Sequence, residues 1–320
     1  MEHISHDRVP EKIISPRARR DYLLPASILI SALIVSGAWI YVTGLENVKD
    51  YPGDSPEAGT ASQGAISAAA LEEEVLPSEG VVLPAVWGDL GARLTDAGVI
   101  DSGKMRAVYN QRGLFPAEYE ALLSGTRNGN LKITGKNAGY LLNLLWALGL
   151  GNTNPILDSG EMKDSRYGGA QNFASTGGWT LAKGDAMNHY SRHAFLGLNA
   201  EEQALVDKVS RGIYRPCCGN STHFPDCNHG MAMLGLLELM ASQGASEKEM
   251  WNAALAVNSY WFPDTYLTIA TYLGNKGINW SNVDPQAILG ADYSSASGYA
   301  NIASQVVKPQ GPSGGNGCGV

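Results

Sequence analysis

The sequence has little charge of either sign and no excess of basic residues. Only 17% of its 320 residues are charged and the formal net charge is -8, whereas about 25% of residues are charged in typical soluble domains. Proteins that bind nucleic acid need a basic surface, and this composition does not supply one. We therefore expect no nucleic-acid partner.

Cysteine is also scarce, with four residues in the whole chain. That number is too small for the dense disulfide scaffold that stabilises small secreted domains. The chain is long enough to bury a sizeable hydrophobic core without such a scaffold. We expect one large domain or two small ones, with glycine-rich loops because 38 residues are glycine.

Two common catalytic motifs are missing from the sequence. There is no HExxH pair of zinc-binding histidines and no thioredoxin-type CxxC. The segment GNLKITGKN approaches a phosphate-binding loop but has asparagine where serine or threonine is needed. The motifs therefore identify neither an enzymatic activity nor a substrate.

A run without charged residues spans residues 22–45. A helix of this length, rising about 1.5 Å per residue, crosses a hydrocarbon core of about 30 Å. Three arginines precede the run and acidic residues follow it, so the positive-inside rule places residues 1–21 in the cytoplasm. The run exceeds a typical signal-peptide core, and no small-residue cleavage pattern follows it. We predict an uncleaved, single-pass signal anchor that contacts membrane lipid, with the main domain extracytoplasmic.

Two further segments have the composition of flexible chain. Residues 46–80 are rich in Gly, Ala, Ser, Pro and Glu and have few large apolar side chains, which predicts a linker with at most a short helix around residues 68–74. Residues 308–320 form a Gly- and Pro-rich tail that carries Cys318. The domain proper is expected within residues 81–307.

That domain is predicted to be all-α. Strand alternation is weak, and a helical period is read from Pro84 onward. Helix starts are indicated by capping residues or prolines at Asp101, Pro116, Thr134, Asn199, Ser246, Pro263 and Asp284. The apolar segments at 135–151 and 230–243 are expected to lie in the core, and residues 164–184 to form a long irregular loop.

Histidine and cysteine gather in one part of the sequence. Four of the six histidines and three of the four cysteines fall between residues 189 and 229. Random scatter over the extracytoplasmic residues would rarely produce such a group. This clustering is the main functional signal of the sequence.

The first element of the cluster is DAMNHYSRH, in which Asp185, His189 and His193 are spaced four residues apart. On a helix these side chains project along one side, where two imidazoles one turn apart can chelate a cation. The carboxylate would be a third ligand or would orient a histidine. A solvated polar helix face explains the spacing equally well.

The second element is PCCGNSTHFPDCNHG, which contains Cys217, Cys218, His223, Cys227 and His229. Thiolate and imidazole ligands on a turn-rich loop are typical of tetrahedral zinc, or of cuprous copper where sulfur dominates. The spacing matches no standard zinc finger. Whether this loop and the Asp/His segment share one site is left open.

Disulfide bonds are the main alternative use of these cysteines, because an extracytoplasmic location is oxidising. A bond between Cys217 and Cys218 would be strained, since adjacent Cα atoms are about 3.8 Å apart and bridged ones about 4.4–6.8 Å. Pairing with Cys227 or Cys318 is unstrained. A disulfide alone does not explain why two histidines lie in the same loop, so metal binding is favoured.

The sequence therefore predicts a membrane-anchored extracytoplasmic protein that binds zinc or copper through a Cys/His cluster. A second hypothesis is a thiol–disulfide exchange protein that uses the vicinal cysteines and Cys318. A third is a binding module of the cell envelope stabilised by disulfides. The sequence leaves open whether the protein is an enzyme and which proteins it binds.

Overall fold

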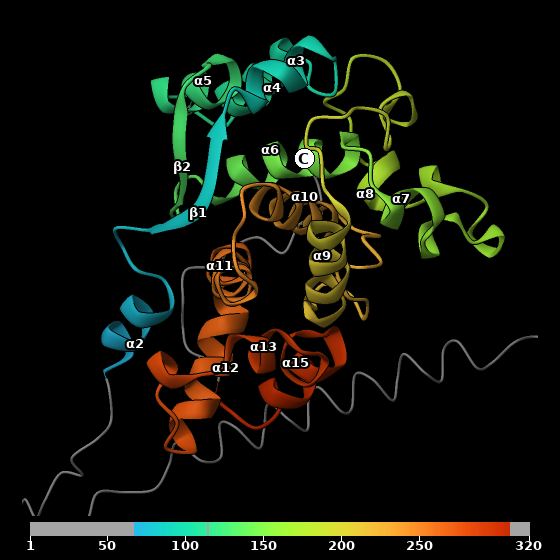
Figure 1. Ribbon diagram of the computed structural model, residues 1–320. Coiled ribbons are helices and arrows are strands. Elements are labelled where there is room, and N and C mark those ends of the chain that lie inside the picture. Colours follow the sequence, from blue (N-terminus) through green and yellow to red (C-terminus); the bar gives the residue numbers. More distant parts are fainter. Residues whose placement is uncertain (1–66, 114, 308–320) are drawn as a thin grey trace, which may run out of the picture. The chain divides into compact units, whose positions relative to one another are not determined.

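The computed structural model describes residues 67–113 and 115–307 of the chain (Figure 1). The predicted leader (1–21), anchor (22–45) and tail with Cys318 lie outside these residues. Among the helices that the structure describes, none combines the length and apolar character needed to cross a bilayer.

Helices form most of the described chain, as predicted (Figure 1). The α-helices are α2 (Ala68–Val75), α3 (Leu90–Asp96), α4 (Ser102–Gln111), α5 (Ala117–Ser124), α6 (Ala138–Gly151), α7 (Pro155–Ser159), α8 (Ala174–Gly177), α9 (Ala200–Gly212), α10 (Asn228–Ser242), α11 (Glu247–Trp261), α12 (Pro263–Asn275), α13 (Pro285–Leu289), α14 (Ala291–Ser294) and α15 (Ala296–Ala303). Short 3₁₀ turns are η2 (Glu161–Lys163), η3 (Ser165–Tyr167), η4 (Ala170–Asn172), η5 (Ala186–Asn188) and η6 (Trp280–Asn282).

The predicted helix starts are confirmed where a local cap sets them. The Asp101 side chain accepts hydrogen bonds from the first turn of α4, and the side chain of Asp284 caps α13. Asn199 and Ser246 each form a capping box with a glutamate three residues on, which starts α9 and α11. These signals involve neighbours in the chain, so the sequence alone is enough to find them.

A two-stranded antiparallel sheet, which was not predicted, accompanies the predicted helices. Strands β1 (Val81–Gly88) and β2 (Asn128–Ile133) pair with a register irregularity between Val82 and Val86. Buried Leu83, Ala85 and Trp87 alternate with more exposed residues along β1. The alternation is hard to see because the outer face also carries apolar side chains. A helical period from Pro84 was therefore the wrong interpretation of this segment.

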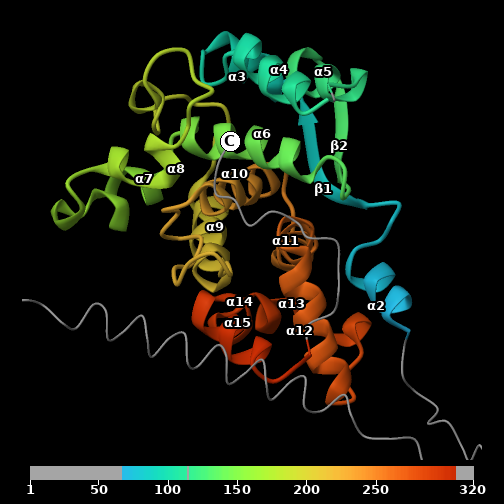
Figure 2. The same ribbon diagram turned by 180° about the vertical axis from the view of Figure 1, so that it is seen from behind.

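Helices α6 and α10 form the centre of the core. Both are almost entirely buried, which their apolar sequences predict. They cross in close contact, because a Cβ at Gly149 would lie 2.1 Å from the Met231 carbonyl oxygen and one at Gly235 would lie 2.5 Å from that of Leu145. In both views the sheet and α3–α5 lie on one side of this pair, and α12–α15 lie on the other (Figures 1 and 2).

One carboxyl group lies within this core. Glu238 of α10 is fully buried, and its side chain accepts a hydrogen bond from the Asn154 amide. Burial raises the pKa of Glu238 well above its usual value. The neutral acid is the form that an apolar interior accommodates.

Candidate metal centre

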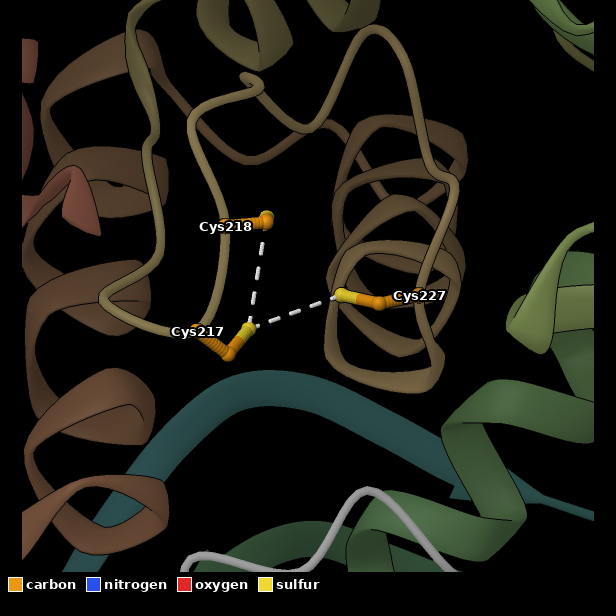
Figure 3. Close-up of side chains that lie close together, drawn as sticks. All are labelled: Cys217, Cys218 and Cys227. Carbon is orange, nitrogen blue, oxygen red and sulfur yellow. Dashed lines mark hydrogen bonds between the residues drawn. The ribbon is translucent and has the colours of Figure 1, made fainter. Parts of the chain in front are cut away.

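The three described cysteines are held by the connection between α9 and α10. After α9 the chain forms an irregular loop whose two arms are joined by the Thr222 amide, which donates to the Ile213 carbonyl at 2.8 Å. Cys217 and Cys218 lie in the first half of the loop, soon after α9, while Cys227 ends the loop as the N-cap residue of α10. The loop therefore brings the vicinal pair back to the start of a buried helix (Figure 3).

The sulfur atoms of these cysteines lie close together. The Sγ atom of Cys217 lies 4.0 Å from that of Cys218 and 3.7 Å from that of Cys227, and all three sulfurs lie within 4.8 Å of one another. With metal–sulfur bonds of about 2.3 Å, ligand sulfurs are about 3.8 Å apart in a tetrahedral site and about 4.0 Å apart in a trigonal one. The observed spacing therefore suits a common metal ion.

The cluster opens to solvent on one side. Cys227 is buried, Cys218 is half-buried and Cys217 is exposed, and all three are free thiols with no disulfide among them. In Figure 3 the sulfur of Cys217 is joined by dashed lines to the side chains of both Cys218 and Cys227. An ion can thus enter beside Cys217 and reach the buried sulfur of Cys227.

Cys227 is the cysteine of the group whose pKa is lowered. Hydrogen bonds from the thiols of Cys217 and Cys218 lower its pKa most, and the charge of Arg215 lowers it further despite burial. The Arg215 Nε donates to its sulfur at 3.2 Å, and the Gly230 amide in the first turn of α10 donates at 3.4 Å. A helix N-terminus favours negative charge at this position. The same thiol contacts raise the pKa of Cys217.

Arg215 supplies the positive charge beside this sulfur. Its side chain is fully buried, and its Nη2 donates to Asp226 at 2.9 Å. Burial lowers the pKa of Arg215, but the charges of Cys227, Cys218, Asp226 and Cys217 together outweigh this and the pKa is raised. A Cβ at Gly230 would lie 2.8 Å from the guanidinium carbon. Glycine at this position therefore lets the guanidinium pass against α10.

Sequence reasoning missed Arg215 and Asp226. Arg215 is a lone basic residue before Pro-Cys-Cys, and Asp226 directly precedes Cys227. Adjacency to the cysteines was the only available signal. An arginine in a polar loop is normally exposed, so its burial could not be inferred from its type.

The structure places His223 outside the cysteine cluster. Its Nε2 lies 2.7 Å from an Asp207 carboxylate oxygen, and the Arg211 guanidinium lies against the same nitrogen at 2.8 Å. The pKa of Asp207 is lowered, first by its hydrogen bond from Arg211 and also by His223. His223 thus attaches the loop to α9.

His229 lies next to the cluster without joining the three-sulfur group. It is the second residue of α10, buried, with its ring centroid 4.4 Å from that of Phe262. Its interaction with the Cys227 thiol helps to lower the pKa of that thiol. Its Nδ1 has no hydrogen-bond partner among the described residues. His229 therefore borders the buried side of the centre.

The Asp185, His189 and His193 segment is separate from the cysteines and is not a helix. Asp185 caps the short turn η5 through the Met187 amide. The chain then turns through Ser191, the one described non-glycine residue with a positive φ, at 52°. The helical spacing was thus the wrong premise. The two imidazoles nevertheless meet, with His189 Nδ1 3.1 Å from His193 Nε2.

The chain matches no protein family, and no curated protein or solved structure shows significant similarity to it. Its chemistry is therefore inferred from the side chains themselves. Within the part of the chain that the structure describes, the three cysteines are the one group of three or more His, Cys, Asp or Glu residues close enough to share an ion. Thiolates in such a group select soft metal ions.

Proposed function

We propose that Cys217, Cys218 and Cys227 bind a single thiophilic metal ion, and that cuprous copper fits this centre better than zinc. The observation that carries the proposal is the convergence of three sulfurs to within 4.8 Å. A loop connecting two helices has no structural need for three free thiols in contact. A shared metal ion explains both their number and their spacing.

The donor set favours copper. Structural zinc sites are four-coordinate and closed by protein ligands, whereas the described residues place three sulfurs together. Cu(I) is selected by soft sulfur donors. A zinc ion at the same position would complete its coordination with water, as in sites that keep an open position.

The electrostatics of the site support binding of a cation by thiolates. The pKa of Cys227 is lowered, first by its hydrogen bond with Cys217, and the pKa of Cys217 is raised, first by its hydrogen bond with Cys218. The hydrogen bond with Cys217 lowers the pKa of Cys218, but the hydrogen bond with Cys227 and burial outweigh this and raise it. Metal binding displaces the protons that remain on the thiols, so metal affinity rises with pH. The buried guanidinium of Arg215 offsets part of the negative charge that the three thiolates bring together.

Thiol–disulfide exchange is the second candidate, because the Cys227 sulfur lies 3.7 Å from the Cys217 sulfur. Cys227 would attack a partner's disulfide, form a mixed disulfide and release one partner thiolate. Cys217, after losing its proton to solvent, would attack Cys227 and release the second partner thiolate. The chain gains a Cys217–Cys227 disulfide and the partner's disulfide is reduced. Burial of Cys227 hinders the first step.

The cellular setting of this centre is proposed from the sequence alone. The uncharged run at residues 22–45 and the arginines before it support a single-pass anchor with the metal centre on the extracytoplasmic side. A disulfide-stapled binding module is a weaker proposal, since Cys217, Cys218 and Cys227 are free thiols.

The proposal is tested by titrating the reduced full-length protein with Cu(I) against a chelator without oxygen. We expect one tightly bound copper per chain and protection of three of the four thiols from alkylation. If Cys217, Cys218 and Cys227 are the three ligands, the Cys318→Ser variant should bind equally well. Four reactive thiols in the presence of copper would contradict the metal centre, whereas tight zinc binding without copper would contradict only the choice of metal.

A further inference from the structure

We infer that His189 and His193 form a second metal-binding site, for a borderline divalent cation such as Zn²⁺, independent of the cysteine centre. The carrying observation is the approach of two ring nitrogens, His189 Nδ1 and His193 Nε2, to 3.1 Å. Two imidazole ligands with metal–nitrogen bonds of about 2.0–2.1 Å have nitrogens about 3.3 Å apart in a tetrahedral site. The distance between the two nitrogens is therefore close to that of two ligands of one ion.

The hydrogen bonding of His189 sets the direction of its free nitrogen. Its Nε2 lies 3.0 Å from the Lys183 carbonyl oxygen, which can only accept, so Nε2 carries the proton. Nδ1 then has a lone pair directed at His193. Ligating histidines usually donate their second ring N–H in this way to a carbonyl or carboxylate. His189 thus already has the tautomer and orientation of a metal ligand.

His193 can offer a second lone pair at small cost. In the metal-free protein its Nε2–H donates to His189 Nδ1. Within residues 67–113 and 115–307, His193 Nδ1 makes no hydrogen bond, so the proton can move there without breaking another contact. Burial, followed by the neighbouring His189, lowers the pKa of His193.

Backbone contacts hold the two rings in place. The amide of His193 donates to the Gly151 carbonyl at the end of α6, and its carbonyl accepts from Thr153, both at 2.9 Å. The His193 ring stacks between the ring of His189 and that of Phe195, with centroids 5.4 and 5.2 Å away. Little side-chain entropy is then lost on binding, which favours affinity.

Solvent provides the remaining ligands. His193 is half-buried, so an ion held by the pair stays open to water. Asp185 is exposed and bonded to its own turn, which leaves it outside the pair. A two-histidine site of this kind binds more weakly than the three-thiolate centre and prefers ions that accept imidazole.

The test uses Zn²⁺ and the full-length Cys217→Ser/Cys218→Ser/Cys227→Ser variant, which lacks the thiolate centre. This protein should still bind zinc, as measured by competition with a zinc indicator. Adding His189→Gln should weaken binding at least about tenfold. Adding His223→Gln, which alters a histidine outside the pair, should leave the affinity unchanged.

If His189→Gln and His223→Gln change the zinc affinity equally, the inference is wrong, and His189 and His193 only form a hydrogen bond with each other. If the triple serine variant does not fold by circular dichroism, histidine nitrogen NMR of the copper-loaded wild type replaces it. Zinc should then shift the His189 Nδ1 and His193 Nε2 signals, and unchanged signals would contradict the site. The zinc measurements on the triple variant do not depend on copper binding, because this variant lacks the three cysteines. The two proposals can therefore fail independently.

Discussion

Replacing Cys227 by serine should lower Cu(I) affinity by more than about 100-fold, because even losing an outer partner of a metal ligand costs about 10–100-fold. Cys227 is the one cysteine of the three that is buried and has a lowered pKa. A serine hydroxyl keeps the approximate size of the side chain but neither the charge nor the soft donor. Competition with a Cu(I) chelator measures the change.

The control for this variant is a measurement of its thermal unfolding. Serine can still cap α10 by accepting from the Gly230 amide, so the unfolding temperature should change little. A variant that keeps its fold and retains wild-type copper affinity would show that Cys227 is not a ligand. If Cys227→Ser loses both its copper affinity and its fold, the Cys217→Ser variant replaces it in the test. The thiol of Cys217 is exposed and does not cap a helix.

Replacing Arg215 by methionine should destabilise the protein by about 3–5 kcal/mol, the cost of removing one partner from a buried ion pair. The guanidinium is fully buried and bonded to both Asp226 and Cys227. Methionine retains much of the apolar stem but leaves the Asp226 carboxylate and the Cys227 sulfur without the buried guanidinium that they contact. Urea unfolding of the metal-free protein measures the loss.

Arg211→Met is the control, because the Arg211–Asp207 ion pair is largely exposed and such pairs contribute about 0–1 kcal/mol. Adding Asp226→Asn to Arg215→Met should recover part of the loss by removing one unpaired charge. If Arg215→Met and Arg211→Met destabilise equally, the buried guanidinium does not hold the cluster together.

The fold was predictable where the signals are local. Asp101, Asn199 and Ser246 start the helices that their caps predicted, because each cap bonds to amides two or three residues on. Strand β1 was missed, since its pairing with β2 joins residues about forty to fifty positions apart and its outer face is apolar. Non-local pairing of this kind leaves little trace in a single sequence.

The candidate site was predicted in part. The cysteines of one loop do meet, as their clustering indicated. His189 and His193 also meet, but through a left-handed turn at Ser191 rather than a helix. The sequence could not place the two groups relative to each other, nor show that a buried arginine supports the first. Both depend on tertiary packing around α10.

The most direct test of the central claim is X-ray absorption at the copper edge of the Cu(I)-loaded, full-length protein. We expect three sulfur neighbours of copper at a single distance near 2.3 Å. Their number should be unchanged in Cys318→Ser and smaller in Cys227→Ser. A first shell made of nitrogen and oxygen neighbours, or one that keeps all its sulfurs in Cys227→Ser, would contradict it.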